Sequence, residues 1–554
     1  MVRSTFRMVL SAVVLALSLF ACDACRSQGT TRSTSGGTPV TAERPALRLY
    51  LVTDLAGALE PCGCVKDQLG GMDKLGALVA KDKGAARAHA TLAVGPTFFM
   101  DPRLTGERRA QEIAKAETIA KSLGALGAAA ITPGRNDWAA GPEALSKLGA
   151  AATAAIVAAN VTGAGVELAK WKLIDAGEVK VGVVGVSSFG DASPTAEADA
   201  GADPLADAKV DAAIDAAKAA ATEATKQGAK AIVVLAATGR GEAKRIADAM
   251  PDALAVVVGS PTSSGDANTQ AAPAERVGDV LVVQAGNHLQ TVGVLDLFAR
   301  PGAAAKFADG TGVDAIRKRE EIGRRIDELR VKIAVWERDG TIPKADVEAR
   351  KADLAKLTRE RDALDQTPPP KDGNFYRYAM RDVRGDLGED EAVKAQMLAY
   401  YKKVNEDNRA AFADRKPRPP AKGEPGYAGI DLCTNCHEDA RKVWDKTAHA
   451  SAYKTLADQY KQFNLDCVSC HVTGYDRPGG STVVQVGELT NVQCEVCHGP
   501  SSLHAKSPDK VKPPVPKPSP DSCAACHHPP HVHEFDAKAK MSAILGPGHG
   551  QPAK

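Results

Sequence analysis

The chain has 554 residues, of which 70 are Lys or Arg and 68 are Asp or Glu, giving a formal net charge of +2 at pH 7. This length exceeds what one hydrophobic core usually organises, so we expect several domains. The balanced charge lacks the basic field with which proteins neutralise nucleic-acid phosphates, so nucleic acid is excluded as an expected partner.

The first 22 residues have the pattern of an export signal. Two arginines precede an apolar run, residues 8–20, that is too short for a typical membrane span. The run ends in Leu-Phe-Ala-Cys, which resembles the bacterial lipobox and implies cleavage before Cys22 and a lipid on its thiol. A plain signal peptide cleaved near Cys25 is the alternative. Residues 23–45 predict a flexible tether. We therefore expect an exported protein, lipid-anchored on the periplasmic side of a bacterial membrane.

Residues 46–300 predict an α/β domain. Apolar, β-rich runs alternate with Ala-rich helical stretches such as Ala206–Gln227, a pattern typical of sheets covered by helices. The expected architecture is a sandwich with helices on the outside. We expect strands at Leu47–Leu55, Ala154–Val161, Val179–Val186, Ala231–Leu235, Leu254–Val258 and Val280–Ala285.

Several segments of this domain resemble the calcineurin-like metallophosphoesterases of the 5′-nucleotidase type. Thr53-Asp54-Leu55-Ala56-Gly57 stands where that family has Asp-x-His-Gly. Residues 134–141 stand where it has Gly-Asn-His-Glu-Phe-Asp-x-Gly, and residues 158–161 and 179–185 are further close matches.

The metal ligands of that family are largely replaced. Its members hold two cations that activate water, and only Asp54 remains here of the side chains that would bind them. The replacements are Ala56, Pro96, Arg135, Ala237, Pro261 and Ser263, with Asn136 at the position of the acid/base His. The resemblance therefore implies a pseudoenzyme scaffold in which phosphate-ester hydrolysis is absent.

A Cys-Gly-Cys loop follows the first expected strand. Cys62 and Cys64 stand in Glu-Pro-Cys-Gly-Cys, close to the lost metal site. A Cys-x-Cys pair can form only a tight, strained and readily reduced disulfide. The pair could exchange electrons with the rest of the chain, grip a soft metal, or consist of unreactive buried thiols.

Residues 313–410 predict a helical hairpin and a connector. Isoleucines and leucines recur at helical spacing on both sides of residues 340–343, and we expect a strand at Phe375–Val383 and a helix at Glu389–Phe412. The dense Arg and Glu pattern indicates solvated faces, with dimerisation through the hairpin as the alternative. Residues 411–427 form a Pro-rich linker to a mostly α domain over 428–550.

Eight cysteines in the last domain form four Cys-x-x-Cys-His units. Two thiols at this spacing can bond to the vinyl groups of one haem, and the adjoining His can bind its iron. Zinc sites, redox dithiols or disulfides are alternatives that do not need a His after the second Cys. We expect four haem c groups. Their attachment residues are Cys433 and Cys436, Cys467 and Cys470, Cys494 and Cys497, and Cys523 and Cys526, and the proximal ligands are His437, His471, His498 and His527.

The residues 428–550 resemble the cytochrome c-554 family of tetrahaem cytochromes. The resemblance runs from Cys-x-x-Cys-His through Trp-x-x-x-x-His-x-x-Ala and Cys-Glu-x-Cys-His-Gly-Pro-x-Ser-x-His to a closing His-Gly. It implies that His449, His504 and His549 are distal ligands, that some haems stack in pairs, and that one iron has an open or weakly held sixth position. His528, His531 and His533 are further candidates that put such a vacancy in doubt.

Two function classes remain. The first is an electron-transfer cytochrome whose nucleotidase-like domain docks a partner or holds geometry. The second is an oxidoreductase for a small nitrogen or sulfur substrate at an open haem or at Cys62 and Cys64. The first is favoured because no cluster of catalytic acid, base and nucleophile is visible. Expected partners are other cytochromes or a membrane quinol-linked complex.

Overall fold

The computed structural model describes residues 43–61, 68–190, 203–263, 268–338, 342–364, 370–528, 532 and 535–549. The expected export signal, with Cys22 and Cys25, and nearly all of the expected tether lie outside these residues. Within them, no helix is long and apolar enough to cross a membrane. The described residues from Arg44 onward belong to one structural unit.

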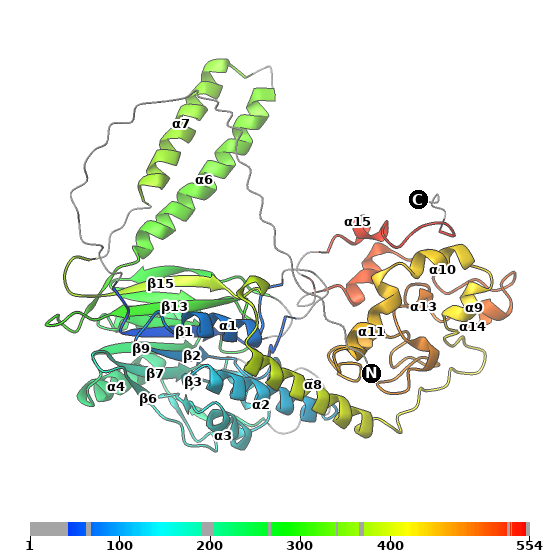
Figure 1. The fold of residues 1–554 in the computed structure, drawn as a ribbon, viewed down its shortest axis with the longest axis horizontal. Coiled ribbons are helices and arrows are strands. Elements are labelled where there is room, and N and C mark those ends of the chain that lie inside the picture. Colours follow the sequence, from blue (N-terminus) through cyan, green and yellow to red (C-terminus); the bar gives the residue numbers. More distant parts are fainter. Residues whose placement is uncertain are drawn as a thin grey trace, which may run out of the picture. The chain divides into compact units, whose positions relative to one another are not determined.

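Two β-sheets form the centre of the α/β domain (Figure 1). The first contains, in spatial order, β14 (Phe307–Asp309), β15 (Asn374–Asp382), β13 (Thr291–Phe298), β1 (Leu47–Thr53), β2 (Ala88–Val94), β3 (Ala128–Thr132) and β4 (Ala155–Ile156). The second contains β11 (Ala272–Val277), β12 (Val280–Gln284), β10 (Ala255–Gly259), β9 (Ala231–Ala237), β7 (Lys180–Ser187) and β6 (Trp171–Asp175). In each sheet the central strands are parallel, with β1 to β4 in the first and β7, β9, β10 and β12 in the second. Parallel strands end at a common edge, which is where loops can converge on a site.

Alternating side chains of β1 show how the layers pack. Leu47, Leu49 and Leu51 lie in a core between the two sheets, whereas Tyr50 and Val52 face the helices on the other side. Those helices are α1 (Met72–Asp82), α2 (Arg109–Ala125), α3 (Pro142–Ala151) and α8 (Glu391–Ala411). The outer face of the second sheet is covered by α4 (Ala213–Lys226) and α5 (Arg240–Ala249). The expected α/β sandwich with outer helices is therefore confirmed.

Two expected elements differ from the structure. The stretch Ala206–Gln227 is helical only from Ala213, because Lys209–Val210 instead forms β8 and pairs with β5 (Val161–Thr162). The expected strand Ala154–Val161 divides into β4 and β5, which lie in different sheets. Between them, the Asn160 amide donates to the Ser187 and Asp211 carbonyls at 2.7 and 3.1 Å. These bonds hold the bend that ends one strand and begins the next.

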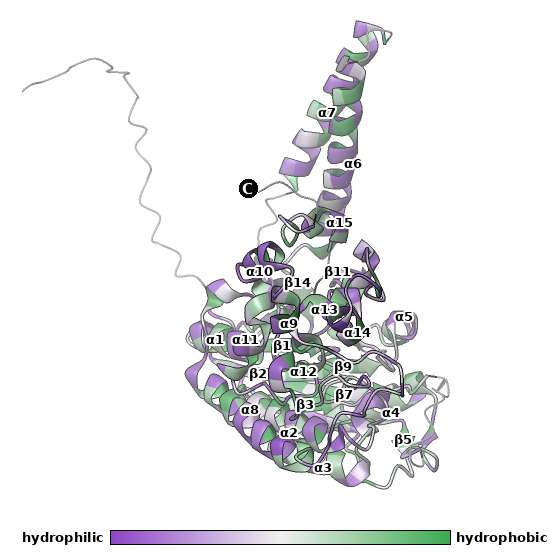
Figure 2. Cartoon of the chain, turned by 90° about the vertical axis from the view of Figure 1, so that its right-hand side faces the viewer, coloured by the Kyte–Doolittle hydropathy of each residue, from purple (hydrophilic) through white to green (hydrophobic). Residues whose placement is uncertain are grey.

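The helical hairpin consists of α6 (Val313–Arg338) and α7 (Lys344–Ala363), as expected. Ile322, Ile326 and Ile333 are buried, and hydrophilic residues are spread over both helices (Figure 2). The hairpin interrupts the first sheet, because β14 precedes it and β15 follows it, and these two strands pair in parallel. The connector thus contributes a strand to the sheet, and its helix α8 packs on α1 and α2.

The C-terminal residues form short helices joined by loops. These are α9 (Ile430–Thr434), α10 (Glu438–Trp444), η3 (Ala448–Ser451), α11 (Ala452–Ala457), α12 (Val468–His471), η4 (Gly487–Leu489), α13 (Cys494–His498), α14 (Ser502–Lys506), η5 (Pro520–Ala525) and α15 (Ala537–Met541). A small apolar cluster of Val468, Val472 and Val486 lies among them. Few buried apolar side chains are available, so polar contacts and any bound cofactor have a large share in holding this part together.

We predict that Gly185→Ala strongly destabilises the α/β domain. A Cβ at this position of β7 would lie 2.1 Å from the Val157 carbonyl oxygen and 2.5 Å from the Thr132 hydroxyl oxygen. Overpacking of this kind costs about 3 kcal/mol or more of the free energy of unfolding. Denaturant unfolding followed by circular dichroism measures the loss.

Gly323→Ala is the matched control. Gly323 lies in α6, and a Cβ there would meet no atom within 4 Å. The substitution should stabilise the hairpin by about 1 kcal/mol, because Ala has the higher helix propensity. Equal effects of the two substitutions would contradict the close approach between β7 and its neighbours.

Candidate functional site

Each Cys-x-x-Cys-His unit occupies about one turn of helix. The His437 amide donates to the Cys433 carbonyl at 3.0 Å, and the His527 amide donates to the Cys523 carbonyl at 2.8 Å. This spacing places the first Cys and the His four residues apart on one side of the turn. The second and third units lie at α12 and α13. The helical geometry therefore presents two thiols and one imidazole from each unit.

Several thiols of the eight cysteines in these units lie close to one another. A hydrogen bond between the Cys433 and Cys494 thiols raises the pKa of Cys433 and lowers that of Cys494. A hydrogen bond from Cys526 likewise lowers the pKa of Cys470 to about 6. The first unit thus lies beside the third, and the second beside the fourth.

Three pairs of imidazole rings face each other across nearly the same gap. The ring centroids are 6.4 Å apart in one pair, 6.2 Å in another and 6.3 Å in the third. Two imidazoles bound to opposite sides of one iron would have centroids about 6 Å apart, because a metal–nitrogen bond is about 2 Å and the ring centre lies about 1 Å further back. The pairs are His437 with His504, His449 with His527, and His498 with His549.

Backbone carbonyls fix the tautomer of three of the candidate ligands. The Nδ1 atoms of His471, His498 and His504 lie 2.6, 2.9 and 2.6 Å from the carbonyl oxygens of Ala452, Val515 and Val511. A carbonyl oxygen can only accept, so each Nδ1 carries the proton and each Nε2 keeps a lone pair for a metal. This arrangement orients an imidazole that binds iron.

Three further imidazoles are held in the neutral form. Burial and the neighbouring His527 lower the pKa of His449, and burial lowers the pKa of His527. Burial, together with His498 and His437, lowers the pKa of His549. A neutral imidazole is the form that coordinates a metal. These shifts therefore favour ligation at neutral pH.

His471 differs from the other three proximal candidates. Among the residues that the structure describes, no second histidine ring is paired with it. His528 lies near enough to the Cys470 thiol to contribute to lowering its pKa. His531 and His533 lie outside the described residues. Of the three further candidates for a distal ligand, His528 is thus the one that the structure places near this unit.

Three residues that the sequence analysis left without a role organise these units. The carboxylate of Glu495, which is 2 % exposed, accepts from the amides of Ala428, Gly429 and Ser501 at 2.7 to 2.9 Å. Gln493 accepts from the Ile430 amide at 2.8 Å. The Phe535 ring stacks on His527 with centroids 4.2 Å apart. The Cys-Glu-x-Cys-His pattern contained Glu495, but two of its three partners, Ala428 and Gly429, lie more than 60 residues earlier and cannot be inferred from spacing.

Trp444 is the first residue of the Trp-x-x-x-x-His motif that contains His449. Its indole N–H donates to the Val492 carbonyl at 2.8 Å, and the Arg441 guanidinium lies over its ring. The Val492 amide in turn donates to the His449 carbonyl at 3.2 Å. Trp444 therefore ties the helix that leads to His449 to the segment that precedes the third unit.

The donor set fits c-type haem. Paired thiols stand one helical turn from a proximal imidazole, and three proximal imidazoles face a second ring across the gap that one iron would fill. The residues would supply both covalent attachment and axial ligation.

The side chains of Asp54 and Asn136, two positions compared above with the metallophosphoesterase motifs, are engaged in hydrogen bonds. The Asp54 carboxylate accepts from the Ser260 amide at 2.6 Å and from the Gln284 amide at 3.4 Å. The Asn136 side chain, which is fully buried, donates to the Met100 carbonyl at 2.5 Å and accepts from the Thr262 hydroxyl at 3.0 Å. Among the described residues, no group of three or more His, Cys, Asp or Glu side chains could hold a metal ion. Cys62 and Cys64 lie outside the described residues.

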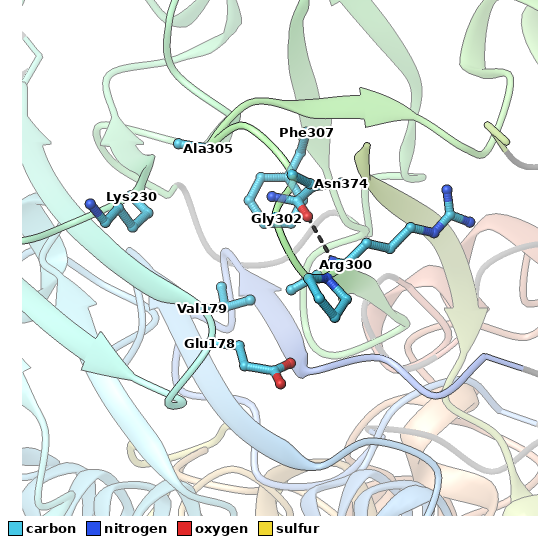
Figure 3. A pocket seen from close by; sticks show the side chains of 11 residues that line it. Glu178, Val179, Lys230, Arg300, Gly302, Ala305, Phe307 and Asn374 are labelled. Carbon is cyan, nitrogen blue, oxygen red and sulfur yellow. Dashed lines mark hydrogen bonds between the residues drawn. The ribbon is translucent and has the colours of Figure 1, made fainter. Parts of the chain in front are cut away.

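A pocket of about 410 Å³ lies at the opposite end of the strands (Figure 3). Its lining includes Val179 and Lys230, which immediately precede β7 and β9, whereas Asp54 follows the end of β1. Two of its charged side chains already have partners. Arg300 donates to the Pro370 carbonyl at 2.7 Å, and Glu178 accepts from Arg87 at 2.6 Å. The pocket is therefore separate from both the Asp54 edge and the histidine pairs.

Comparison with known proteins bears on the C-terminal part. Residues 432–499 match the family model of cytochrome c554 and c-prime. The C-terminal part is thus similar to a c-type cytochrome, and residues 428–549 are called the cytochrome region below after this similarity. Cytochrome c-554 of Nitrosomonas europaea is 36 % identical over 91 residues, which are 13 % of this chain and 38 % of that protein. The chain thus spans well under half the length of this curated relative.

Two solved structures align with about two thirds of the chain or slightly more. A 5′-nucleotidase precursor from Thermus thermophilus is 17 % identical, with a TM-score of 0.42, covering 67 % of this chain and 61 % of that one. The sulfate thiohydrolase SoxB of Thermus thermophilus is 13 % identical, with a TM-score of 0.42, covering 72 % of this chain and 68 % of that one. The α/β sandwich itself is defined by its strand order and its layers.

We predict that Asp54→Asn makes stability less dependent on pH. Burial raises the pKa of Asp54 from 3.8 to about 6, although bonds from Ser260 and Gln284 oppose the shift. A raised carboxyl pKa means that the wild type loses stability as the pH rises from about 4 to about 6. The variant should match the wild type near pH 4 and be more stable by about 3 kcal/mol or less at pH 7.5. Thermal unfolding at the two pH values measures the difference.

Asp248→Asn is the control for that experiment. Asp248 is exposed on α5, so its replacement should change stability little at either pH. An Asp54→Asn variant that is less stable than the wild type at pH 7.5 would mean that the ionised carboxylate is needed there.

Proposed function

We propose that this chain is an extracytoplasmic, lipid-anchored cytochrome that holds four c-type haems and transfers electrons. The observation that carries the proposal is the set of three imidazole pairs, each of which joins one proximal His to one distal His at 6.2 to 6.4 Å. A c-type haem supplies one-electron oxidation and reduction at its iron. The chain's own residues bind, orient and screen it.

The ring pairs give a ligand assignment. His437 and His504 serve the first attachment unit, His498 and His549 the third, and His527 and His449 the fourth. Bis-His ligation leaves no position for a substrate, which favours electron transfer at these three sites. The thiol neighbours set the first unit beside the third and the second beside the fourth. The third unit in turn lies beside the fourth, because Cys523 contributes to raising the pKa of Cys497. The four sites therefore form one series of neighbours, an arrangement suited to relay.

The nucleotidase-like domain then acts as a scaffold without phosphoesterase activity. The support is the Asp54 carboxylate, whose oxygens are taken up by Ser260 and Gln284, and the Asn136 amide, which is bonded to backbone and hydroxyl groups. A side chain so engaged does not present itself to a cation. Redox partner proteins, such as other cytochromes or a quinol-linked membrane complex, would meet the chain outside the cytoplasm.

A second candidate function is favoured by His471. Its ring has a fixed tautomer but no facing histidine ring among the described residues. An open site there would accept a small nitrogen or sulfur compound, whereas His528, His531 or His533 would close it. Cys62 and Cys64 are a further candidate redox site. Glu60, two residues before Cys62, pairs with Lys461, which lies six residues before Cys467.

We predict four haems per chain. We also predict that removal of a distal His changes the spin state of one iron. The pyridine haemochrome of the matured protein, divided by its protein concentration, should give four. His504→Ala, His549→Ala and His449→Ala should each convert one low-spin ferric site to high spin, because each removes one of two axial ligands. Electron paramagnetic resonance of the ferric protein measures the change.

His89→Ala is the control, since His89 lies in β2 of the α/β domain. It should leave every signal unchanged. A protein without haem, or one whose three distal variants keep the wild-type spectrum, would refute the assignment. A high-spin signal in the wild type that changes on addition of cyanide would support the open site at His471, and its absence would refute that candidate function.

We predict that changing Cys62 and Cys64 together to Ser shows whether this thiol pair takes part in electron transfer. If the pair exchanges electrons with the cytochrome region, the rate at which a dithiol reductant reduces the protein should fall about tenfold or more in the variant. Stopped-flow absorbance at the haem bands measures the rate. Cys25→Ser tests whether loss of a thiol elsewhere matters. Equal rates for all three proteins would assign Cys62 and Cys64 a structural role.

A further inference from the structure

A polar interface joins the second attachment unit to the α/β domain. The residues Phe463–Asp466 immediately precede Cys467, and they are bonded to helices α2 and α8, which lie alongside each other (Figure 1). The Gln111 side chain of α2 accepts from the Leu465 amide at 2.9 Å and donates to Asn464 Oδ1 at 3.2 Å. Asn408 of α8 donates to the Phe463 carbonyl at 2.8 Å and to Gln111 Oε1 at 2.9 Å.

Four charged side chains stand beside this network. Lys115 of α2 donates to Asp466 at 3.0 Å and to Glu112 at 2.9 Å. Arg108, next to the start of the same helix, pairs with both Asp466 and Glu112. Burial alone would raise the pKa of Asp466, but Lys115 and Arg108 lower it to about 2, so this carboxylate is ionised at neutral pH. Two cations therefore face two carboxylates, and the formal charge of the cluster is zero.

Three of the four charged side chains are largely withdrawn from water, whereas Arg108 is 38 % exposed. The side chains of Lys115 and Glu112 are 10 % and 7 % exposed, and that of Asp466 is 27 % exposed. Gln111 and Asn464 are each 2 % exposed. Removing charges from water is costly, and an apolar contact of similar size would hold two domains together at least as well. Adhesion alone therefore does not account for four charges at this position.

The position of the charges offers another role. Asp466 immediately precedes Cys467, the first attachment residue of the second unit, in the sequence. A carboxylate so close to a redox centre disfavours addition of an electron, and a nearby cation favours it. Because the surroundings are poorly hydrated, solvent screens these charges less than it would at the surface. A change in the net charge of the cluster should therefore shift the reduction potential of the haem on the second unit.

We propose that helix α2 sets the reduction potential of the haem on Cys467 and Cys470, with Arg108 and Lys115 acting as positioning residues that hold Asp466 and offset its charge. The nucleotidase-like domain thereby tunes one of the four redox centres from outside the cytochrome region. This inference rests on the proposed attachment of haem to that unit.

A charge series tests the proposal in the full-length holoprotein. Lys115→Met leaves the cluster with a net charge of −1, Glu112→Gln leaves it with +1, and the double variant restores zero. One of the four midpoint potentials should fall in the first variant, rise in the second and return to the wild-type value in the third. The other three potentials should stay where they are. Spectroelectrochemical titration measures all four.

The series distinguishes charge from damage to the packing. Loosened packing would move the potential in the same direction in both single variants, and that result would overturn the proposal. The proposal would also be overturned if none of the four midpoint potentials changed with the charge of the cluster. Lys121→Met, at an exposed position of α2, is the matched control and should have no effect. The haem content of each protein separates the two hypotheses: a wild type without haem refutes the proposed function, whereas four bound haems with unresponsive potentials refute only this inference.

Discussion

The cytochrome region depends on pairs of imidazole rings that the fold brings to a fixed separation. Each ring of a pair comes from a different part of the sequence, and each needs its own support. Carbonyl oxygens orient His471, His498 and His504, and a stacked Phe535 supports His527. With only a small apolar cluster nearby, the backbone cannot rely on a large hydrophobic core to keep these rings in place. Buried acceptors such as Glu495 and Gln493 take over that task by binding the loop before the first attachment unit.

The α/β domain and the cytochrome region hold their side chains in place by different interactions. In the α/β domain, apolar side chains fill three cores between and outside two sheets, and a single added methyl group at Gly185 has no room. In the cytochrome region, directional hydrogen bonds replace dense packing. The contact between them, at Gln111, Asn408 and Asn464, is of the second kind. Orientation across that contact is therefore set by bonding geometry, which is more specific than apolar adhesion.

The sequence predicted some features well because they are local. The attachment units are recognised within five residues, and most expected strands of the α/β domain are continuous apolar runs, as strands buried on both faces are. From the sequence, no individual helix was identified at α2, where the polar residues Gln111, Glu112 and Lys115 are buried against the usual pattern of an amphipathic helix. The partners within each histidine pair could not be chosen either. Which rings face each other depends on the path of the loops between the short helices, and the spacing of the histidines in the sequence does not predict that path.

The place where the hairpin enters the α/β domain also limits how the gene could be altered. Its two ends leave from β14 and β15, which are paired neighbours, so a longer or shorter pair of helices would leave the sheet undisturbed. Ending the chain at the hairpin would, in contrast, disturb the sheet. β15 lies between β14 and β13, and its loss would uncover a row of backbone amides and carbonyls along β13, inviting another strand to add on. Fragments that end at the hairpin should therefore associate through this edge rather than remain monomeric.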